Sequence, residues 1–364
     1  MTQRTLSIAL TGAVSALALM ATACSPKHDE AKTAGDTPAA ASQTTESGKP
    51  DADMQAVLDK LASLGGKPIE TLSPTDARLQ PTPADAVKAI MTEKGIAPDA
   101  TVTTKDIMYA GGAGPQKARV YTPAGAGVNT PVVLYIHGGG WVIADLDTYD
   151  GGARSLAKES GAIVVSIEYR HAPEAKFPAA HDDAIAAYKW LLANAKTIGG
   201  DPTRIAVAGE SAGGNMAVNV AIAARDQKLQ APKAVIAVYP VADSNMATGS
   251  KTAKATAKPL NTPMLAWFFT NTLANPAQAT DPRLNLVGAK LEGLPPTTII
   301  LAEIDPLRDD GANLADKLRA AGVQTDLKEY QGVTHEFFGM GPVVADAKDA
   351  EAYAGSKLKT ALGL

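Results

Sequence analysis

The 364-residue sequence contains only one cysteine, Cys24, which lies near the N-terminus and before the segments that could form a folded core. A domain that follows it therefore holds neither a disulfide nor a free thiol. This composition suits an oxidising compartment and excludes a cysteine nucleophile in that domain.

The sequence also lacks an excess of basic residues and, after residue 25, any long apolar run. Its 34 Lys and Arg against 38 Asp and Glu give a formal net charge of -4, so we expect no nucleic-acid partner. No run of about 18 apolar residues follows residue 25, and we predict no membrane-spanning helix in the body of the chain. With 45% hydrophobic and 20% charged residues, the composition is typical of a globular protein.

The N-terminus has the pattern of an export signal. Arg4 supplies a positive charge, Leu6–Met20 an apolar run, and Ala21–Ala23 the small residues that a signal peptidase needs. We predict a signal peptide over residues 1–23, removed before the protein folds.

Cys24 directly follows those small residues, where a bacterial lipoprotein carries the cysteine that receives diacylglycerol. The position resembles a lipobox, although Ala21 stands where leucine is usual. We therefore expect an exported protein attached to a membrane through lipidated Cys24. The alternative is ordinary cleavage after Ala23, which leaves a periplasmic or secreted protein with one exposed thiol.

Residues 25–50 contain no Val, Ile, Leu, Met, Phe, Trp or Tyr, and so cannot bury a core. We predict that residues 24–53 comprise the lipidated cysteine and a disordered tether, and that the folded domain spans residues 54–364. Within that domain, two amphipathic helices are expected first, at Met54–Leu64 and Pro83–Lys94.

The rest of the domain follows an α/β pattern. Two alternating segments, Asp106–Ala110 and Ala118–Thr122, predict an antiparallel pair at a sheet edge. Short apolar runs then alternate with helical stretches, which predicts a mostly parallel central sheet with helices on both faces. The predicted strands are Val132–Ile136, Ala162–Ile167, Ile205–Ala208, Ala234–Tyr239, Thr297–Leu301 and Asp326–Tyr330, and the predicted helices are Pro178–Ala195, Ala212–Arg225 and Gly311–Ala321. An insertion near residues 243–282 interrupts this alternation and is expected to form a cap.

A nucleophile motif lies between a predicted strand and a predicted helix. Gly209–Gly214 reads Gly-Glu-Ser-Ala-Gly-Gly, the Gly-x-Ser-x-Gly pattern of a sharp turn that exposes Ser211. Only glycine-sized neighbours let the strand and the helix approach closely enough for this turn. The turn also places Ser211 at a helix N-terminus, where free amides favour negative charge. We predict Ser211 as the nucleophile.

A second glycine motif, His137–Trp141, follows the strand Val132–Ile136 and reads His-Gly-Gly-Gly-Trp. Successive glycines remove side chains and let backbone amides face a substrate oxygen, as an oxyanion hole requires. The predicted donors are the amides of Gly139, Gly140 and Ala212, with Gly138 shaping the turn.

A serine nucleophile needs a base, and the sequence has five histidines. His28 falls in the predicted tether, His137 belongs to the glycine motif, and His171 and His181 flank a proline-rich loop and a helix start. His335 remains, just after the last predicted strand, and we predict it as the base.

The acid that orients this base should follow an earlier strand. Asp305 comes just after the strand Thr297–Leu301 and precedes a proline, which favours it over the nearby Glu303 and Asp309. The chain order Ser211, Asp305, His335 is the order found in α/β-hydrolases.

Together these motifs resemble the hormone-sensitive lipase family of carboxylic ester hydrolases, the bacterial family IV esterases. The likeness runs from about Met54 to Leu362. The matching segments are His137–Trp141, Tyr169–Glu174 with Phe177–Ala180, Gly209–Gly214, Tyr239–Pro240 and Asp305–Asp309. The resemblance implies an α/β-hydrolase fold, a cap built from the N-terminal helices and the insertion, and hydrolysis of short-chain esters without metal or cofactor.

The sequence departs from the family pattern in three places. Glu210 replaces the commoner aspartate beside the nucleophile, His171 replaces a usual leucine, and Asp281–Leu286 only loosely matches the signal expected after the cap. We interpret the charged Tyr169–Glu174 segment as structural, with Arg170 and Glu174 tying a loop rather than contacting substrate.

The predicted function is hydrolysis of a small-molecule ester through an acyl-enzyme on Ser211. One alternative directs the same triad at O-acetyl groups of polysaccharides or xenobiotics. Another is a surface lipoprotein that uses an inactive hydrolase fold for binding; inactive relatives usually lose a triad residue, and none is missing here.

Overall fold

The computed structural model describes residues 48–364. The predicted signal peptide, Cys24 and most of the predicted tether lie outside the described residues. Within residues 48–364, no helix combines the length and the apolar composition needed to cross a membrane.

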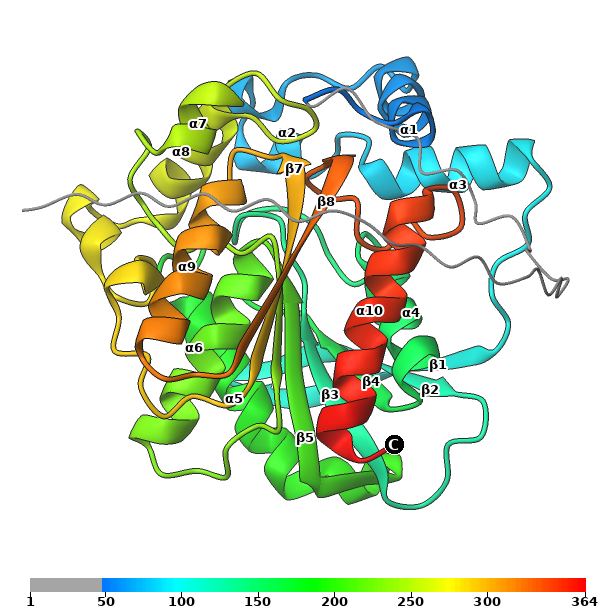
Figure 1. Ribbon diagram of the computed structural model, residues 1–364, viewed down its shortest axis with the longest axis vertical. Coiled ribbons are helices and arrows are strands. Elements are labelled where there is room, and N and C mark those ends of the chain that lie inside the picture. The colour runs from blue at the N-terminus through cyan, green and yellow to red at the C-terminus, as the bar shows by residue number, and fades with distance from the viewer. Residues whose placement is uncertain (1–47) are drawn as a thin grey trace, which may run out of the picture. The chain divides into compact units, whose positions relative to one another are not determined.

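The centre of the domain is an eight-stranded sheet in the order β1-β2-β4-β3-β5-β6-β7-β8 (Figure 1). The hairpin β1–β2 forms one edge, β2 pairs antiparallel with β4, and the remaining pairs are parallel. The strands are β1 (Val102–Gly111), β2 (Gly114–Pro123), β3 (Thr130–Ile136), β4 (Ile163–Ile167), β5 (Gly200–Glu210), β6 (Val235–Val238), β7 (Thr297–Ile304) and β8 (Thr325–Thr334). The predicted α/β-hydrolase architecture is confirmed.

Four of the parallel strands are buried along their whole length because helices cover both faces of the sheet. Every residue of β3, β4, β6 and β7 is buried. Alternate side chains of β3 enter two separate hydrophobic clusters, Leu134 in one and Val133 in the other, as the pleat of a strand requires. Helices α5 (Ala179–Asn194), α6 (Ala212–Asp226) and α9 (Arg308–Ala320) cover the first cluster, and α4 (Asp150–Ser160) and α10 (Ala345–Leu362) the second.

Helices α4 and α10 were not predicted from the sequence. They pack against each other on one side of the sheet (Figure 1). The buried stripe of α10 consists largely of small residues, including Ala347, Ala350, Ala354 and Gly355. Because alanine and glycine give little hydrophobic periodicity, this stripe does not stand out in the sequence.

The folded domain begins earlier than predicted. Helix α1 spans Ala52–Ser63, so it starts two residues before Met54. The amide of Asp51 donates to the Gly332 carbonyl at 2.8 Å, and the amide of Gly48 donates to Glu303 Oε1 at 2.7 Å. Residues 48–53, assigned to the tether, therefore belong to the domain; their polar composition gave no sign of these contacts with the ends of β7 and β8.

The N-terminal segment and the insertion form the cap. The former contains α1, η1 (Ile69–Thr71), α2 (Pro74–Ala77) and α3 (Pro83–Glu93), and the latter α7 (Gly249–Ala253), α8 (Thr262–Thr272) and η3 (Pro276–Thr280). Figure 1 shows α1, α2, α7 and α8 beyond the ends of β7 and β8. Short 3-10 turns η2 (Ala195–Ile198) and η4 (Leu286–Gly288) complete the described elements.

Two hydrogen bonds join the halves of the cap. Trp267 Nε1 donates to the Leu72 carbonyl at 3.1 Å, and Asn261 Nδ2 donates to Glu70 Oε1 at 3.0 Å. The bonded residues are 195 and 191 positions apart in the sequence. The cap is therefore one structure built from two parts of the chain that are distant in sequence.

Met54→Ala tests whether α1 is an integral part of the domain. Met54 is fully buried, so we expect its truncation to lower the free energy of unfolding by about 2–5 kcal/mol. Gln55→Ala, on the exposed side of the same helix, should change it by less than about 0.5 kcal/mol. Urea denaturation measures both, and equal stability of the two variants would contradict the integration of α1.

Candidate active site

Ser211 lies on a strained turn between β5 and α6. Its φ of 57° and ψ of -118° are rare for a residue with a side chain. A Cβ on Gly213 would lie 1.9 Å from the Ile136 carbonyl oxygen, and one on Gly209 would lie 2.3 Å from the Gly213 carbonyl oxygen. Glycine is therefore required at both positions, which confirms the steric reason inferred from the Gly-x-Ser-x-Gly motif.

Ser211, His335 and Asp305 form one hydrogen-bonded chain. His335 Nε2 lies 3.0 Å from Ser211 Oγ, and His335 Nδ1 lies 2.7 Å from Asp305 Oδ2. A carboxylate can only accept, so Nδ1 carries the proton and Nε2 is free to accept from the serine hydroxyl. Asp305 follows β7 and His335 follows β8, and the structure brings together the three residues predicted as a triad.

The other two acidic candidates point elsewhere. Glu303 accepts hydrogen bonds from the amides of Gly48 and Gly332. Asp309 accepts from the Ser250 amide at 2.8 Å and pairs with Arg308. Asp305 is fully buried, and its second oxygen accepts from the Leu307 amide at 2.8 Å, which fixes the carboxylate against the imidazole.

The glycine loop follows β3, and each of its glycines is needed. Gly139 and Gly140 have φ of 87° and 57°, and a Cβ on Gly140 would lie 2.2 Å from the Phe268 ring. A Cβ on Gly138 would lie 2.2 Å from the Tyr149 hydroxyl. Among residues 48–364, the amides of Gly139, Gly140 and Ala212 donate no hydrogen bond. These predicted donors are thus available to a ligand.

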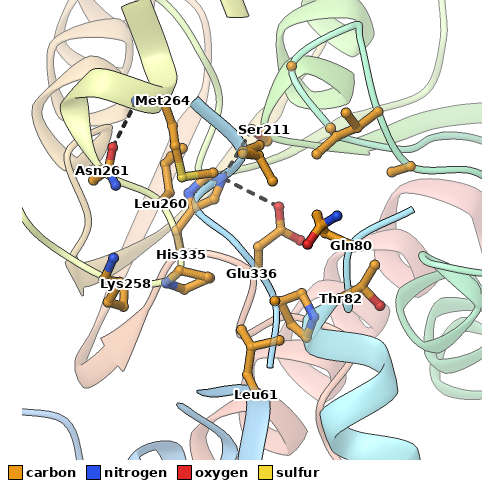
Figure 2. A pocket seen from close by; sticks show the side chains of 18 of the residues that line it. Leu61, Gln80, Thr82, Ser211, Lys258, Leu260, Asn261, Met264, His335 and Glu336 are labelled. Atoms are coloured by element: carbon orange, nitrogen blue, oxygen red, sulfur yellow. Dashed lines mark hydrogen bonds and ion pairs between the residues drawn. The ribbon is translucent and has the colours of Figure 1, made fainter. Parts of the chain in front are cut away.

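A cavity of about 840 Å³ lies between the sheet and the cap. Ser211, His335, Gly139 and Gly140 line its floor, and both halves of the cap line its walls. Figure 2 shows Leu61 of the N-terminal segment and Met264 of the insertion at this cavity. Apolar wall residues are Leu58, Leu61, Leu260, Met264, Phe268 and Phe269. Such a cavity suits a small, largely apolar molecule.

A family model for the alpha/beta hydrolase fold matches residues 133–339. The chain belongs to this family. Carboxylesterase NlhH of Mycobacterium tuberculosis is 42% identical over 250 residues, which cover 67% of this chain and 78% of that protein. An ethyl acetate hydrolase of Pseudomonas putida is 37% identical over 229 residues, covering 62% and 71% of the two chains.

Solved structures agree with this assignment. A thermostable esterase from Pseudomonas putida superposes with a TM-score of 0.78 at 35% identity, covering 88% of this chain and 100% of that chain. An esterase from Pyrobaculum calidifontis gives a TM-score of 0.76 at 34% identity, covering 85% and 98%. The hydrolase is therefore a serine carboxylic ester hydrolase of the hormone-sensitive lipase type, and a purely binding function is not supported.

The charged Tyr169–Glu174 segment of the hydrolase contacts protein. Arg170 pairs with the buried Asp183 at 2.8 Å, and Glu174 pairs with Arg78 of the cap at 2.7 Å. Both contacts fit the structural interpretation of this segment.

Sequence reasoning missed a buried network beneath Ser211. Glu210 is fully buried and accepts hydrogen bonds from the hydroxyls of Tyr135 and Tyr239. Burial raises the pKa of Glu210 to about 8 despite these donors. The network supports the strand end that carries Ser211; the sequence offered only the unusual glutamate as a signal.

Sequence reasoning also missed Glu336, which lines the cavity beside His335. Glu336 Oε1 lies 3.7 Å from His335 Nε2 (Figure 2). It also accepts from the Tyr149 hydroxyl at 2.7 Å. Burial of the His335 ring lowers its pKa, but the charge and hydrogen bond of Asp305, with a further contribution from Glu336, outweigh this and raise it. The imidazole thus has a carboxylate on each side.

Glu336→Gln tests this electrostatic contribution. The substitution keeps an acceptor for Tyr149 but removes a negative charge that favours imidazolium, so the pKa of His335 should fall. The acid limb of the kcat/KM profile for an aryl ester should move to lower pH. Asp226→Asn, at the far end of α6, is the matched control and should leave the profile in place. An unchanged or upward-shifted acid limb in Glu336→Gln would contradict the assignment.

Proposed function

We propose that the hydrolase cleaves short-chain carboxylic esters with Ser211 as nucleophile, His335 as general base and Asp305 as the group that orients the imidazole. The observation that carries this proposal is the chain of two hydrogen bonds, 3.0 Å and 2.7 Å long, that opens onto the cavity. A serine hydroxyl becomes a good nucleophile only when a base takes its proton, and this arrangement supplies one.

The reaction has two steps. Ser211 Oγ attacks the ester carbonyl carbon while its proton passes to His335 Nε2, and the resulting oxyanion accepts from the amides of Gly139, Gly140 and Ala212. The carbon–oxygen bond of the alcohol then breaks as His335 returns the proton to it. Water, deprotonated by His335, releases the acid from the acyl-enzyme and restores Ser211.

The walls of the cavity support small esters as substrates. The Phe268 ring lies so close to Gly140 that no side chain fits between them, which narrows the space beside the proposed oxyanion donors. The ethyl acetate hydrolase among the relatives acts, by its name, on an ester of two carbons on each side. A cavity of about 840 Å³ also has room for an acetyl group carried by a larger alcohol, so an O-acetyl deacetylase is the second candidate.

Ser211→Ala tests the nucleophile. Turnover of p-nitrophenyl acetate and butyrate should fall by about 10⁴-fold or more, because the covalent step is lost. Ser356→Ala, an exposed serine on α10, should keep the parent rate. Parent-like turnover by Ser211→Ala would overturn the assignment. Activity of the parent on aryl esters but not on acetylated glycans would reject the second candidate.

We also propose that the hydrolase is exported and attached to a membrane through lipid on Cys24. Arg4, the apolar run, the small residues Ala21–Ala23 and the single cysteine after them support this proposal. A lipid chain and a following hydrophilic segment would hold the domain at a membrane surface.

Cys24→Ser tests the attachment. In a bacterial host fed an alkyne-tagged fatty acid, the parent chain should incorporate the label and fractionate with membranes, whereas Cys24→Ser should do neither. A parent chain that is exported and cleaved without label would instead indicate ordinary cleavage after Ala23.

A further inference from the structure

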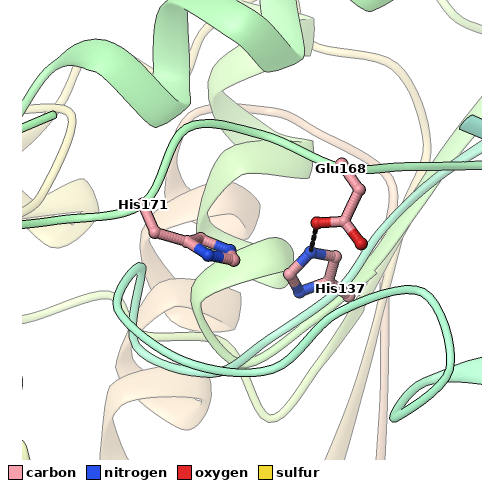
Figure 3. Close-up of side chains that lie close together, drawn as sticks. All are labelled: His137, Glu168 and His171. Atoms are coloured by element: carbon pink, nitrogen blue, oxygen red, sulfur yellow. Dashed lines mark ion pairs between the residues drawn. The ribbon is translucent and has the colours of Figure 1, made fainter. Parts of the chain in front are cut away.

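A second cluster of chemically active side chains lies outside the cavity, where β3 and β4 end. His137 directly follows β3, Glu168 directly follows β4, and His171 comes three residues later (Figure 3). The last residues of the two strands, Ile136 and Ile167, are paired in register. The fold therefore brings the three side chains together at the carboxyl edge of the sheet, next to the glycine loop.

The spacing of the ligand atoms fits a small metal ion. His137 Nε2 and Glu168 Oε2 are 3.5 Å apart, and one potential ligand atom from each of the three residues lies within 4.8 Å of the other two. In a tetrahedral zinc site, atoms about 2.0–2.1 Å from the metal are about 3.4 Å from one another. The pair His137 and Glu168 already has that separation, and the His171 nitrogen lies within 4.8 Å of both atoms.

Each imidazole has a buried nitrogen that makes no hydrogen bond within the described residues. This atom is Nε2 in both rings; in His137 it faces Glu168 Oε2 at an ion-pair distance of 3.5 Å. Leaving buried polar atoms unpaired is costly, and two such atoms in one cluster with a carboxylate call for a shared partner. A metal ion satisfies both nitrogens and the carboxylate at once.

Surrounding groups already orient two of the ligands. His137 Nδ1 lies 3.0 Å from the Gly138 carbonyl. In the tautomer with the proton on Nδ1, this carbonyl accepts from Nδ1 and the lone pair of Nε2 is available to a metal ion. Glu168 Oε1 accepts from the Leu146 amide at 2.8 Å, which leaves Oε2 directed at His137. The Tyr169 ring stacks on the His137 ring with centroids 4.3 Å apart. Such outer contacts are typical of metal-binding residues.

We propose that His137, Glu168 and His171 form a zinc site in which two imidazole nitrogens and one carboxylate oxygen bind the ion. Two imidazoles favour zinc or a similar transition metal over calcium or magnesium. The ion would tie the start of the glycine loop to the segment after β4, and would stabilise the fold without taking part in ester hydrolysis. The proposal is independent of the roles assigned to Ser211, His335 and Asp305.

Metal binding is measured on the full chain, prepared without a histidine tag and with Cys24→Ser to remove the only thiol. After chelator treatment, equilibrium dialysis against Zn²⁺ should give one ion per chain. His171→Leu and Glu168→Gln should each weaken binding at least about 10-fold. Glu174→Gln, in the same loop but paired with Arg78, is the control and should bind as the parent does.

A second readout separates a built site from loose surface binding. Zn²⁺ should raise the Tm of the parent and leave that of His171→Leu unchanged, because only a ligand that prefers the folded state stabilises it. Circular dichroism checks that each variant is folded. If His171→Leu does not fold, Glu168→Gln replaces it in this comparison. Failure of the parent to bind Zn²⁺, or binding by both folded variants as tight as in the parent, would overturn the proposal.

Discussion

The close approach of α6 to the ends of β3 and β5 is the constraint on which the rest of the site depends. Gly213 lies so near the Ile136 carbonyl that no side chain fits, and Ser211 is held at a φ of 57° by the turn that results. Such a conformation costs about 1–3 kcal/mol and persists only when its surroundings determine it. Here the buried sheet and the tightly packed helix α6 determine the conformation of Ser211. They thereby fix the position of its hydroxyl relative to His335 and the glycine loop.

Charge around the turn is distributed among buried groups. The imidazole of His335 lies between the carboxylates of Asp305 and Glu336, which favour a proton on the ring against the effect of burial. Beneath the turn, the carboxyl group of Glu210 has a pKa raised to about 8 and is held by two tyrosine hydroxyls. Because burial raises the pKa of this acid, it carries less negative charge near Ser211, where the proposed reaction would form an oxyanion.

The turn at Ser211, the strands and the candidate base could be predicted because each depends on residues that are close together in the sequence. The glycines at 209 and 213 reveal the turn, the apolar runs reveal the strands, and elimination among five histidines left His335. Contacts between distant segments could not be predicted. Glu336 is held by a hydrogen bond from Tyr149, which is 187 residues away in sequence, and this contact keeps its carboxylate beside the His335 ring. The two halves of the cap are likewise joined by the distant pair Trp267 and Leu72. Helix α10 was not predicted because its buried stripe consists largely of alanine and glycine, which give little hydrophobic periodicity.

We propose that the strained turn, the oriented imidazole and the buried carboxylate together make Ser211 unusually nucleophilic. The most direct measurement is the reaction of the folded hydrolase with a phosphonate ester that modifies activated serines, followed by peptide mass spectrometry. The account predicts one phosphonyl group per chain, on Ser211, with inactivation proceeding at the rate of modification. Inactivation with the label on another residue, or full labelling of Ser211 with activity retained, would contradict it.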